Sequence, residues 1–333
     1  MKIKNLRADQ YFSFFFCVIF LLIQGGLTPT PTQIAQAQLI EVTLVDIPPV
    51  PVLKQAITTD VNFDNAATNS LDNTGQVLTS PTDSLLPVTA LSYVVIDYDS
   101  ATVLLEQFSQ VQTYPASCAK LMTALVAREL YNLDEIVTIA PDASVSGHVI
   151  GLKATEQIRV RELFKATLVS SGNDAAQALA DYYLLGEEAF VDLMNQKAVQ
   201  LSLTNTYFTN PTGLDDFAQL TTSWDLALLA KEVLKDPFLS ELVSLPQTQA
   251  SDTLGLNNYQ LWNTNQFLSQ YSQAKGIKTG TTELAGQVLI TLWQDNGHSL
   301  LIVVMGSLDR YQDTLTLLNW VNTNIEWKSF NSL

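Results

Sequence analysis

A serine and a lysine three residues apart begin an apolar segment of this 333-residue chain. Ser117 and Lys120 lie in the stretch YPASCAKLMTALVAREL, residues 114–130. On a helix, an i, i+3 spacing places both side chains on one face, one turn apart. A serine hydroxyl becomes a nucleophile when a nearby base removes its proton, and a lysine can be that base where burial and neighbouring cations lower its pKa. The pair therefore predicts a nucleophilic serine with a lysine base.

The spacing alone is weak evidence, because Ser272 and Lys275 repeat it in a segment that we expect to be a loop. Taken by itself, Ser117 would be an ordinary serine at the start of a helix. Cys118, directly after it, offers a thiol as the alternative nucleophile. On a helix, however, position 118 points about 100° away from Ser117, and no histidine lies near it in the sequence. We therefore expect Cys118 to be a small buried packing residue.

Two further motifs follow. Residues 170–173 read SSGN, a polar turn between two helical patterns, and residues 277–280 read IKTG, at the entry to a β-hairpin pattern. Ser-x-Asn recurs at 329–331, whereas Lys-Thr-Gly occurs once. The ordered set S-x-x-K, S-x-N and K-T-G is typical of serine β-lactamases and penicillin-binding proteins. The three motifs in this order favour an acyl-transfer site over coincidence.

From about Leu91 to its C-terminus, the chain resembles the D-alanyl-D-alanine carboxypeptidases, the low-molecular-weight penicillin-binding proteins of serine peptidase family S11. The similar segments are PASCAKLMTALVARE, LVSSGNDAAQALAD, EEAFVDLMNQKAVQLSLTNTYFTNPTGLDD, and NTNQFL with GIKTGTTELAG. The resemblance implies an α+β fold, in which helices flank an antiparallel sheet and a helical subdomain is added. It also implies a peptidoglycan stem peptide ending in D-Ala-D-Ala as substrate, β-lactam antibiotics as covalent inhibitors, and no cofactor or metal.

The resemblance gives the motif residues their roles. Ser117 would attack the carbonyl of the penultimate D-alanine and form an acyl-enzyme, with Lys120 as the general base. Ser171, close to Lys120 and Lys278, would relay a proton to the departing D-alanine. Asn173 would bind the substrate amide and hold Lys120. Lys278 would supply positive potential beside Lys120 and for the terminal carboxylate of the substrate.

The remaining roles concern substrate binding. Thr279 would bind the terminal carboxylate through its hydroxyl, and Gly280 would let the strand backbone approach the ligand closely. The backbone N–H groups of Ser117 and Thr281 would form the oxyanion hole. Some family members carry an arginine in the NTN segment, where this chain has Thr264. Carboxylate recognition would therefore depend more on Thr279 and Lys278.

Three alternatives stay open. A class A β-lactamase would carry a glutamate loop reading E-x-x-L-N between the second and third motifs, where this chain has Glu187, Glu188 and Glu232 in helical patterns. A D,D-endopeptidase that cleaves peptidoglycan cross-links would use the same chemistry. A non-catalytic envelope binding module would have no physical reason to keep the whole set of motif residues. A Ser-His-Asp triad is not expected, because His148 and His298 are isolated in the sequence.

Strand patterns occur at both ends of residues 89–333, with helical patterns between them. LSYVVIDYDSATVLLEQF reads as one hairpin, and QVLITLW and HSLLIVVMG form another, joined by Asp-Asn-Gly at 295–297. One α+β domain is expected, whose terminal segments share an antiparallel sheet. Trp262, directly before NTN, is the tryptophan that we expect to line the cleft.

The composition bounds the partners and the location. The chain carries 17 Lys+Arg and 33 Asp+Glu, a net charge of −16, which disfavours nucleic-acid binding. Residues 1–26 combine early basic residues with a short apolar run, as in a signal peptide or an N-terminal membrane anchor. Residues 27–88 are rich in Pro, Thr and Asn and read as a largely disordered linker. We therefore expect an exported protein at the outer face of the cytoplasmic membrane, in the cell wall or periplasm, or secreted, with membrane contact through the N-terminal segment only.

Overall fold

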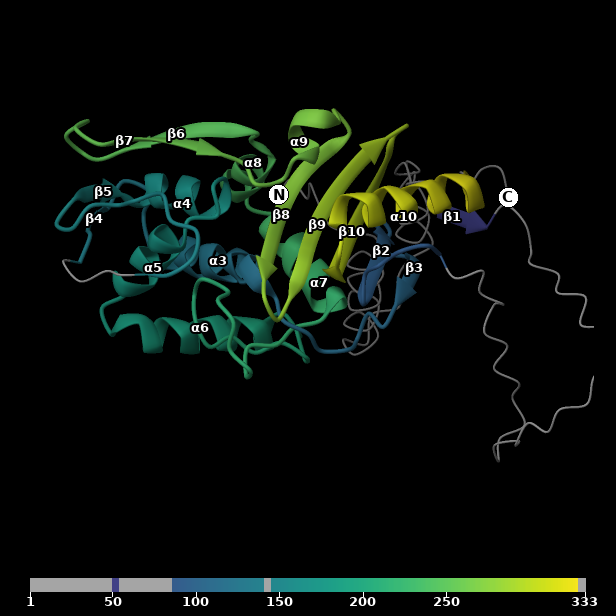
Figure 1. Cartoon of the computed structure of the whole chain (residues 1–333), viewed down its shortest axis with the longest axis horizontal. Coiled ribbons are helices and arrows are strands. Elements are labelled where there is room, and N and C mark those ends of the chain that lie inside the picture. Colours follow the sequence, from purple (N-terminus) through teal and green to yellow (C-terminus); the bar gives the residue numbers. More distant parts are fainter. Residues whose placement is uncertain (1–49, 54–85, 141–144, 329–333) are drawn as a thin grey trace, which may run out of the picture. The chain divides into compact units, whose positions relative to one another are not determined.

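Five antiparallel strands form the central sheet, in the order β3-β2-β10-β9-β8 (Figure 1). The strands are β2 (Ser92–Asp97), β3 (Val103–Gln107), β8 (Ala274–Thr282), β9 (Gly286–Asp295) and β10 (His298–Ser307). Because β2 pairs with β10, segments from the two ends of the domain share one sheet. Both predicted hairpins are present, β2–β3 and β9–β10. Asn296 and Gly297 connect the second with φ values of 50° and 80°, as a two-residue hairpin turn requires.

Helices cover both faces of this sheet, so its inner strands are buried on both sides. All six residues of β2 are buried, and such a strand reads as a continuous apolar run rather than as an alternation. On one face, α10 (Arg310–Asn324) packs against Val95 and Ile302 through its apolar side chains. On the other face, Val94 and Ile96 belong to the main core with α3 (Lys120–Leu130) and α7 (Ser223–Val233).

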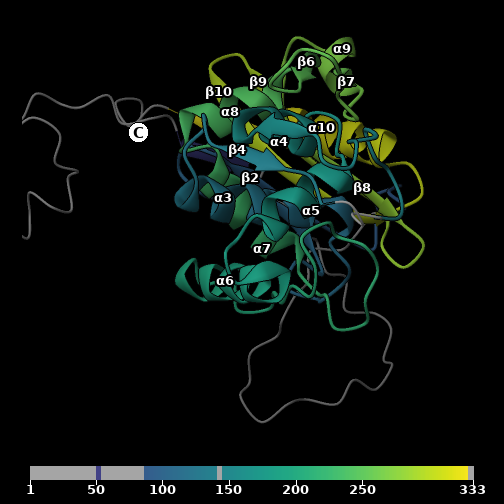
Figure 2. The same cartoon turned by 90° about the vertical axis from the view of Figure 1, so that its left-hand side faces the viewer.

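A helical subdomain with two small hairpins adjoins the sheet. Its helices α3, α4 and α5 lie between the β6–β7 hairpin and helix α6 in both views (Figures 1 and 2). The other elements are α4 (Val160–Leu168), α5 (Asn173–Asp181), α6 (Gly186–Gln200), α8 (Pro237–Ser244), β4 (Ile136–Thr138), β5 (Gln157–Arg159), β6 (Gln247–Ser251) and β7 (Asn258–Trp262). The short helix α9 (Phe267–Gln270) packs instead against β8, β9 and α10. The predicted helices on either side of the SSGN turn are α4 and α5.

The structure, a computed structural model, describes residues 50–53, 86–140 and 145–328. The expected targeting segment 1–26, most of the expected linker 27–88 and the second Ser-x-Asn at 329–331 lie outside these residues. Within the linker range, strand β1 (Val50–Leu53) pairs antiparallel with β11 (Ile325–Lys328), a strand pair that the sequence analysis does not anticipate. No helix in the described part of the chain has the length and hydropathy needed to cross a membrane.

Candidate active site

The nucleophile candidate lies in a short 3₁₀ helix, η1 (Ala116–Ala119), that runs directly into α3. Ala116 has a left-handed φ of 47°, and strained backbone of this kind is common at functional sites. The neighbouring loop approaches very closely, since a Cβ on Gly213 would lie 1.9 Å from the Ala116 carbonyl oxygen. Gly213 itself has a φ of 83°, so only glycine fits this position. The loop that carries Gly213 therefore packs directly against the backbone next to Ser117.

Lys120 is fully buried and directed at Ser117. Its Nζ donates to Ser117 Oγ at 3.0 Å, to Asn173 Oδ1 at 2.6 Å and to the carbonyl oxygen of Thr212 at 2.5 Å. Burial lowers the pKa of Lys120 well below its usual value, and the positive charge of Lys278 lowers it further. Both effects favour the neutral amine over the charged ammonium form. In the neutral form, Nζ keeps two N–H groups for Asn173 and Thr212 and can accept from the Ser117 hydroxyl. A neutral amine within hydrogen-bond reach of a serine hydroxyl is the arrangement that a general base requires.

Ser171 is hydrogen-bonded to a second buried lysine, Lys278. Lys278 Nζ donates to Ser171 Oγ at 2.7 Å and to the Thr279 carbonyl oxygen at 2.9 Å. Ser171 has a left-handed φ of 62°, which is rare for a non-glycine residue. Burial lowers the pKa of Lys278 to about 8. Ser171 was expected near both lysines, and the hydrogen bonds among the described residues join it to Lys278.

Asn173, the first residue of α5, is fixed by three contacts. Its Oδ1 accepts from Lys120, its Nδ2 donates to the Ser146 carbonyl oxygen at 2.7 Å, and its backbone N–H donates to the His148 carbonyl oxygen at 2.7 Å. These partners orient the side-chain amide, because Nδ2 cannot accept from the lysine. The contact with Lys120 is the one that the resemblance implies for this residue.

The third motif lies on strand β8, beside η1. Thr279 Oγ1 lies 2.5 Å from Thr264 Oγ1, so the NTN segment and the third motif meet. A Cβ on Gly280 would lie only 2.8 Å from the backbone N of Ser117. Glycine at 280 therefore lets the strand approach the nucleophile turn, a reason for the glycine beyond the expected approach to the ligand. Thr281, the next residue, pairs with Gln287 of β9 and is exposed.

Two residues that contact the site, Thr212 and Arg310, were not predicted from the sequence. The Thr212 carbonyl that accepts from Lys120 lies in a loop held by Asn210, whose Oδ1 accepts from the backbone N–H of Gly213 at 2.8 Å. Arg310, at the start of α10, donates from Nη1 to the Gly280 carbonyl oxygen at 2.7 Å and to the Val288 carbonyl oxygen at 3.1 Å. The segment NPTGLDD, which resembles the family, is a signal for the first. Nothing in the local sequence singles out Arg310.

The other reactive side chains lie outside this constellation. Cys118 is fully buried, and burial raises the pKa of its thiol to about 11, so its expected packing role is confirmed. Lys275, of the second Ser-x-x-Lys pair, lies in strand β8 rather than in the expected loop, and its exposed side chain donates to the Ser272 carbonyl oxygen. His298 stacks on Trp327, with 4.4 Å between ring centroids. No group of three or more metal-ligating side chains occurs in the described ranges.

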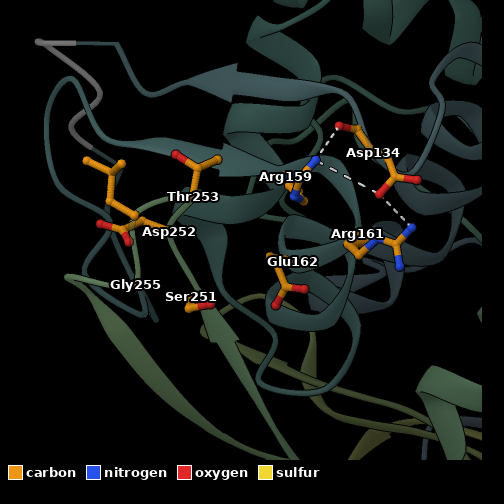
Figure 3. Close-up of a pocket in the computed structure, with 9 residues that line it drawn as sticks. Asp134, Arg159, Arg161, Glu162, Ser251, Asp252, Thr253 and Gly255 are labelled. Atoms are coloured by element: carbon orange, nitrogen blue, oxygen red, sulfur yellow. Dashed lines mark hydrogen bonds and ion pairs between the residues drawn. The ribbon is translucent and has the colours of Figure 1, made fainter.

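Two cavities help to delimit the site. The larger, of about 640 Å³, is lined by Arg159, Arg161 and Asp134 together with the β6–β7 turn. Figure 3 shows the carboxylate of Asp134 between the two arginines, and Arg161 Nη2 donates to it at 2.8 Å. This cavity contains none of the motif residues. A second cavity, of about 540 Å³, is lined by Ser170 and Thr264, immediately beside the second and third motifs, and includes Trp262.

Comparisons with known proteins agree with this geometry. The sequence model of the peptidase S11 family, described as D-alanyl-D-alanine carboxypeptidase, matches residues 76–308. The D-alanyl-D-alanine carboxypeptidase DacF of Bacillus subtilis is 33% identical over 66% of this chain and 57% of its own length. DacC of Escherichia coli is 34% identical over 70% of this chain and 61% of its own length. The chain thus spans about three fifths of these two relatives.

Solved structures bear out the predicted fold. The D-alanyl-D-alanine carboxypeptidase of Mycobacterium tuberculosis has a TM-score of 0.65 at 30% identity, covering 71% of this chain and 93% of that one. The DD-transpeptidase of Streptomyces K15 has a TM-score of 0.66 at 27% identity, covering 71% of this chain and 98% of that one. Together with the family match over residues 76–308, these findings show that the chain belongs to the D-alanyl-D-alanine carboxypeptidase family, peptidase S11.

Proposed function

We propose that this protein is a serine-type D-Ala-D-Ala carboxypeptidase that trims peptidoglycan stem peptides through an acyl-enzyme on Ser117 and is acylated there by β-lactams. The observation that carries the proposal is the 3.0 Å hydrogen bond between Lys120 Nζ and Ser117 Oγ, made by a lysine that is fully buried. Family membership supports the same chemistry. The bond hydrolysed is the amide between the last two D-alanines.

The first step is acylation. Lys120 takes the proton of Ser117 as its Oγ attacks the carbonyl carbon of the penultimate D-alanine. The developing oxyanion is bound by the backbone N–H groups of Ser117 and Thr281, where preorganised donors stabilise charge that forms in the transition state. The C–N bond then breaks, and Ser171, held by Lys278 at 2.7 Å, passes its proton to the leaving amine and receives in its place the proton that Lys120 took from Ser117. Water then attacks the acyl-enzyme: its hydroxyl joins the acyl group, its proton returns to Ser117 Oγ, and the shortened peptide leaves.

The terminal carboxylate of the substrate is recognised by residues of the third motif and the NTN segment. The Thr279 hydroxyl, beside that of Thr264, donates to the terminal carboxylate of the substrate, and Lys278 supplies positive potential. A cationic site is compatible with a net charge of −16, because salt screens exposed charges over about 8–10 Å while buried charges at short range act at nearly full strength. Asn173 binds the amide of the substrate and keeps Lys120 in place.

The direct test is D-alanine release from a pentapeptide that ends in D-Ala-D-Ala. We expect release by the wild-type protein, none from the same peptide ending in D-Ala-L-Ala, and none by Ser117→Ala. Release that persists in Ser117→Ala would rule out the acyl-enzyme. Rapid turnover of benzylpenicillin without D-alanine release would identify a β-lactamase instead. Absence of both activities in a folded protein would identify a D,D-endopeptidase if the protein cleaves a cross-linked dimer, and a non-catalytic binding module if it does not.

The location of the protein is part of the same proposal. Residues 1–26 direct export as a signal peptide or an N-terminal anchor, residues 27–88 form the linker, and residues 89–333 form the catalytic domain outside the cytoplasm, where peptidoglycan is found. Fractionation of cells that express the full chain tests this, with a variant lacking residues 1–26 as control. Retention of both proteins in the cytoplasm would overturn it.

A further inference from the structure

The cavity of about 640 Å³ lies between the β4–β5 hairpin and the turn of the β6–β7 hairpin (Figure 3). Arg159, the last residue of β5, and Arg161, in the first turn of α4, line one wall. The two hairpins are joined here, because Thr253 N donates to the Gln157 carbonyl oxygen at 2.8 Å. Backbone structure therefore fixes both walls of the cavity.

The two arginines of this cavity share one carboxylate. Arg161 Nη2 donates to Asp134 Oδ1 at 2.8 Å, and Arg159 Nη1 donates to the Asp134 backbone carbonyl oxygen at 3.0 Å. The other two carboxylates of the lining have partners of their own. Glu162 is paired with a lysine of its own helix at 2.9 Å, and Asp252 accepts from the N–H groups of its own turn. The arginine wall therefore keeps one positive charge in excess, in a chain of net charge −16.

Unused hydrogen-bond donors gather around this cavity. A guanidinium group has five N–H donors, yet Arg159 uses only Nη1 and Arg161 only Nη2 in their hydrogen bonds with described residues. Arg161 Nε is buried without a partner. The hydroxyls of Ser251 and Thr253, at the hairpin turn, are also unbonded within the described ranges. Because arginine binds carboxylates and phosphates through paired N–H groups, this set of donors fits an oxyanion.

The cavity lies at the other end of the β6–β7 hairpin from the proposed active site. The hairpin runs from this cavity to Trp262 and Thr264, beside the third motif (Figure 1). Strand β7 alone advances about 14 Å, at about 3.4 Å per residue, whereas a dipeptide spans at most about 7 Å. A volume of about 640 Å³ is in the range that holds drug-sized ligands. The oxyanion is therefore carried by a larger molecule and is not the carboxylate that Thr279 would bind.

We propose that this cavity binds a free carboxylate on a neighbouring stem peptide of polymeric peptidoglycan while another stem occupies the active site. The proposal rests on the proposed carboxypeptidase function, which makes a polymer with repeated acidic stem peptides the substrate. Arg159 and Arg161 bind the carboxylate, and the hydroxyls of Ser251 and Thr253 donate to the peptide that carries it. Because the cavity takes no part in bond breaking, it should lower KM for the polymer and leave kcat unchanged.

Binding is measured by co-sedimentation with insoluble peptidoglycan in the Ser117→Ala background, which prevents turnover of the polymer. Three preparations are compared: phosphate-free peptidoglycan, the same material with its carboxyl groups converted to methyl amides, and peptidoglycan that retains its phosphate polymers. The third preparation is needed because phosphate groups of other envelope polymers offer the same oxyanion chemistry. Amidation also blocks the carboxylate bound at the active site, so each variant is compared with its parent on the same material.

The test variant combines Arg159→Gln with Arg161→Gln, and Thr253→Val is a second variant that removes one hydroxyl while keeping the side-chain shape. Arg128→Gln is the matched control, because Arg128 is also a partly exposed arginine paired with an aspartate but lies outside the cavity. Without the Ser117 substitution, each variant is also assayed for D-alanine release from phosphate-free peptidoglycan and from the soluble pentapeptide. Acylation by fluorescent penicillin reports the fold.

We expect the double variant to bind phosphate-free peptidoglycan about tenfold more weakly than its parent, the effect of a lost hydrogen bond to a charged group. On the amidated material the difference should fall below twofold. KM for the polymer should rise about tenfold, while pentapeptide turnover and acylation change less than twofold. Thr253→Val should weaken binding of the polymer in the same direction, and Arg128→Gln should match its parent. If the double variant loses acylation, and so its fold, Thr253→Val decides.

Equal binding by the double variant and its parent, or the same difference on amidated material, would overturn the inference. A difference that appears only on peptidoglycan with phosphate polymers would also overturn it, by assigning the cavity to phosphate. Failure of the proposed function has a separate signature, because the wild type would then release no D-alanine from the soluble pentapeptide. Carboxylate-dependent binding in the Ser117→Ala background would still support the cavity assignment in that case.

Discussion

Lys278 Nζ donates a 2.7 Å hydrogen bond to Ser171 Oγ, and this contact links the second and third motifs across 107 residues of sequence. The same lysine lowers the pKa of Lys120 through its charge, in addition to the larger effect of burial. The two lysines are therefore coupled. A charged Lys278 favours a neutral Lys120, which in turn can accept the proton of Ser117.

Replacing Lys120 should remove the base without displacing the nucleophile. We expect Lys120→Ala to slow penicillin acylation by about 10²–10⁴-fold, the usual contribution of a positioned general base. Lys275→Ala is the matched control, because Lys275 has the same spacing from a serine but is exposed. Stopped-flow mixing with a chromogenic cephalosporin measures the acylation rate of each variant. Equal rates for the two variants would contradict the assignment.

The coupled lysines predict a bell-shaped pH dependence of acylation. On the acidic side the rate should fall as Lys120 takes up a proton, because only its neutral form accepts from Ser117. On the alkaline side it should fall above about pH 8, where Lys278 loses its charge. Second-order acylation rate constants between pH 5 and pH 10 test this. A rate that rises continuously to pH 10 would show that the charge of Lys278 is not required.

The close approach of β8 to the nucleophile turn makes Gly280 irreplaceable. Gly280→Ala would place a Cβ 2.7 Å from the Ala116 Cβ and 2.8 Å from the Ser117 backbone N. We expect a loss of about 1–3 kcal/mol in the free energy of unfolding from overpacking, together with loss of acylation. Gly151→Ala is the control, since its φ of 87° makes it strained while no atom lies within 4 Å of the added Cβ. It should lose stability but keep its acylation rate; normal acylation by Gly280→Ala would refute the role of this contact.

The thiol of Cys118 should be inert in the folded protein. It is fully buried, and burial raises its pKa to about 11, whereas reactive cysteines are exposed thiolates. Iodoacetamide should modify the Cys118 peptide only after denaturation, and Cys118→Ala should retain acylation within twofold. Rapid labelling of the native protein at Cys118 would contradict the structure.

The motif residues could be predicted from the sequence because their identities and order are distinctive. Ser117, Lys120 and Asn173 are linked by hydrogen bonds that the resemblance implied. The Thr212 contact could not be found in this way, because a backbone carbonyl accepts a hydrogen bond whatever the side chain is. Arg310 reaches Gly280 only through the packing of α10 beside the sheet, a tertiary relationship with no local signal.

The fold, too, has parts that could be predicted from the sequence and parts that depend on tertiary contacts. The two hairpins β2–β3 and β9–β10 and the longer helices followed from hydrophobic periodicity, and the Asn296-Gly297 turn from its residue types. The sequence analysis did not predict the two-stranded sheets β4–β5 and β6–β7. The pairing of β1 with β11 joins segments more than 270 residues apart, and no pattern in the four residues VPVL identifies their partner.

The most direct measurement is peptide mapping by mass spectrometry after incubation with benzylpenicillin. We predict one covalent adduct, with the added mass of intact penicillin, on the peptide that contains Ser117, and none in Ser117→Ala. An adduct on another residue, an adduct that persists in Ser117→Ala, or a folded wild-type protein that forms no adduct would contradict an acyl-enzyme on Ser117.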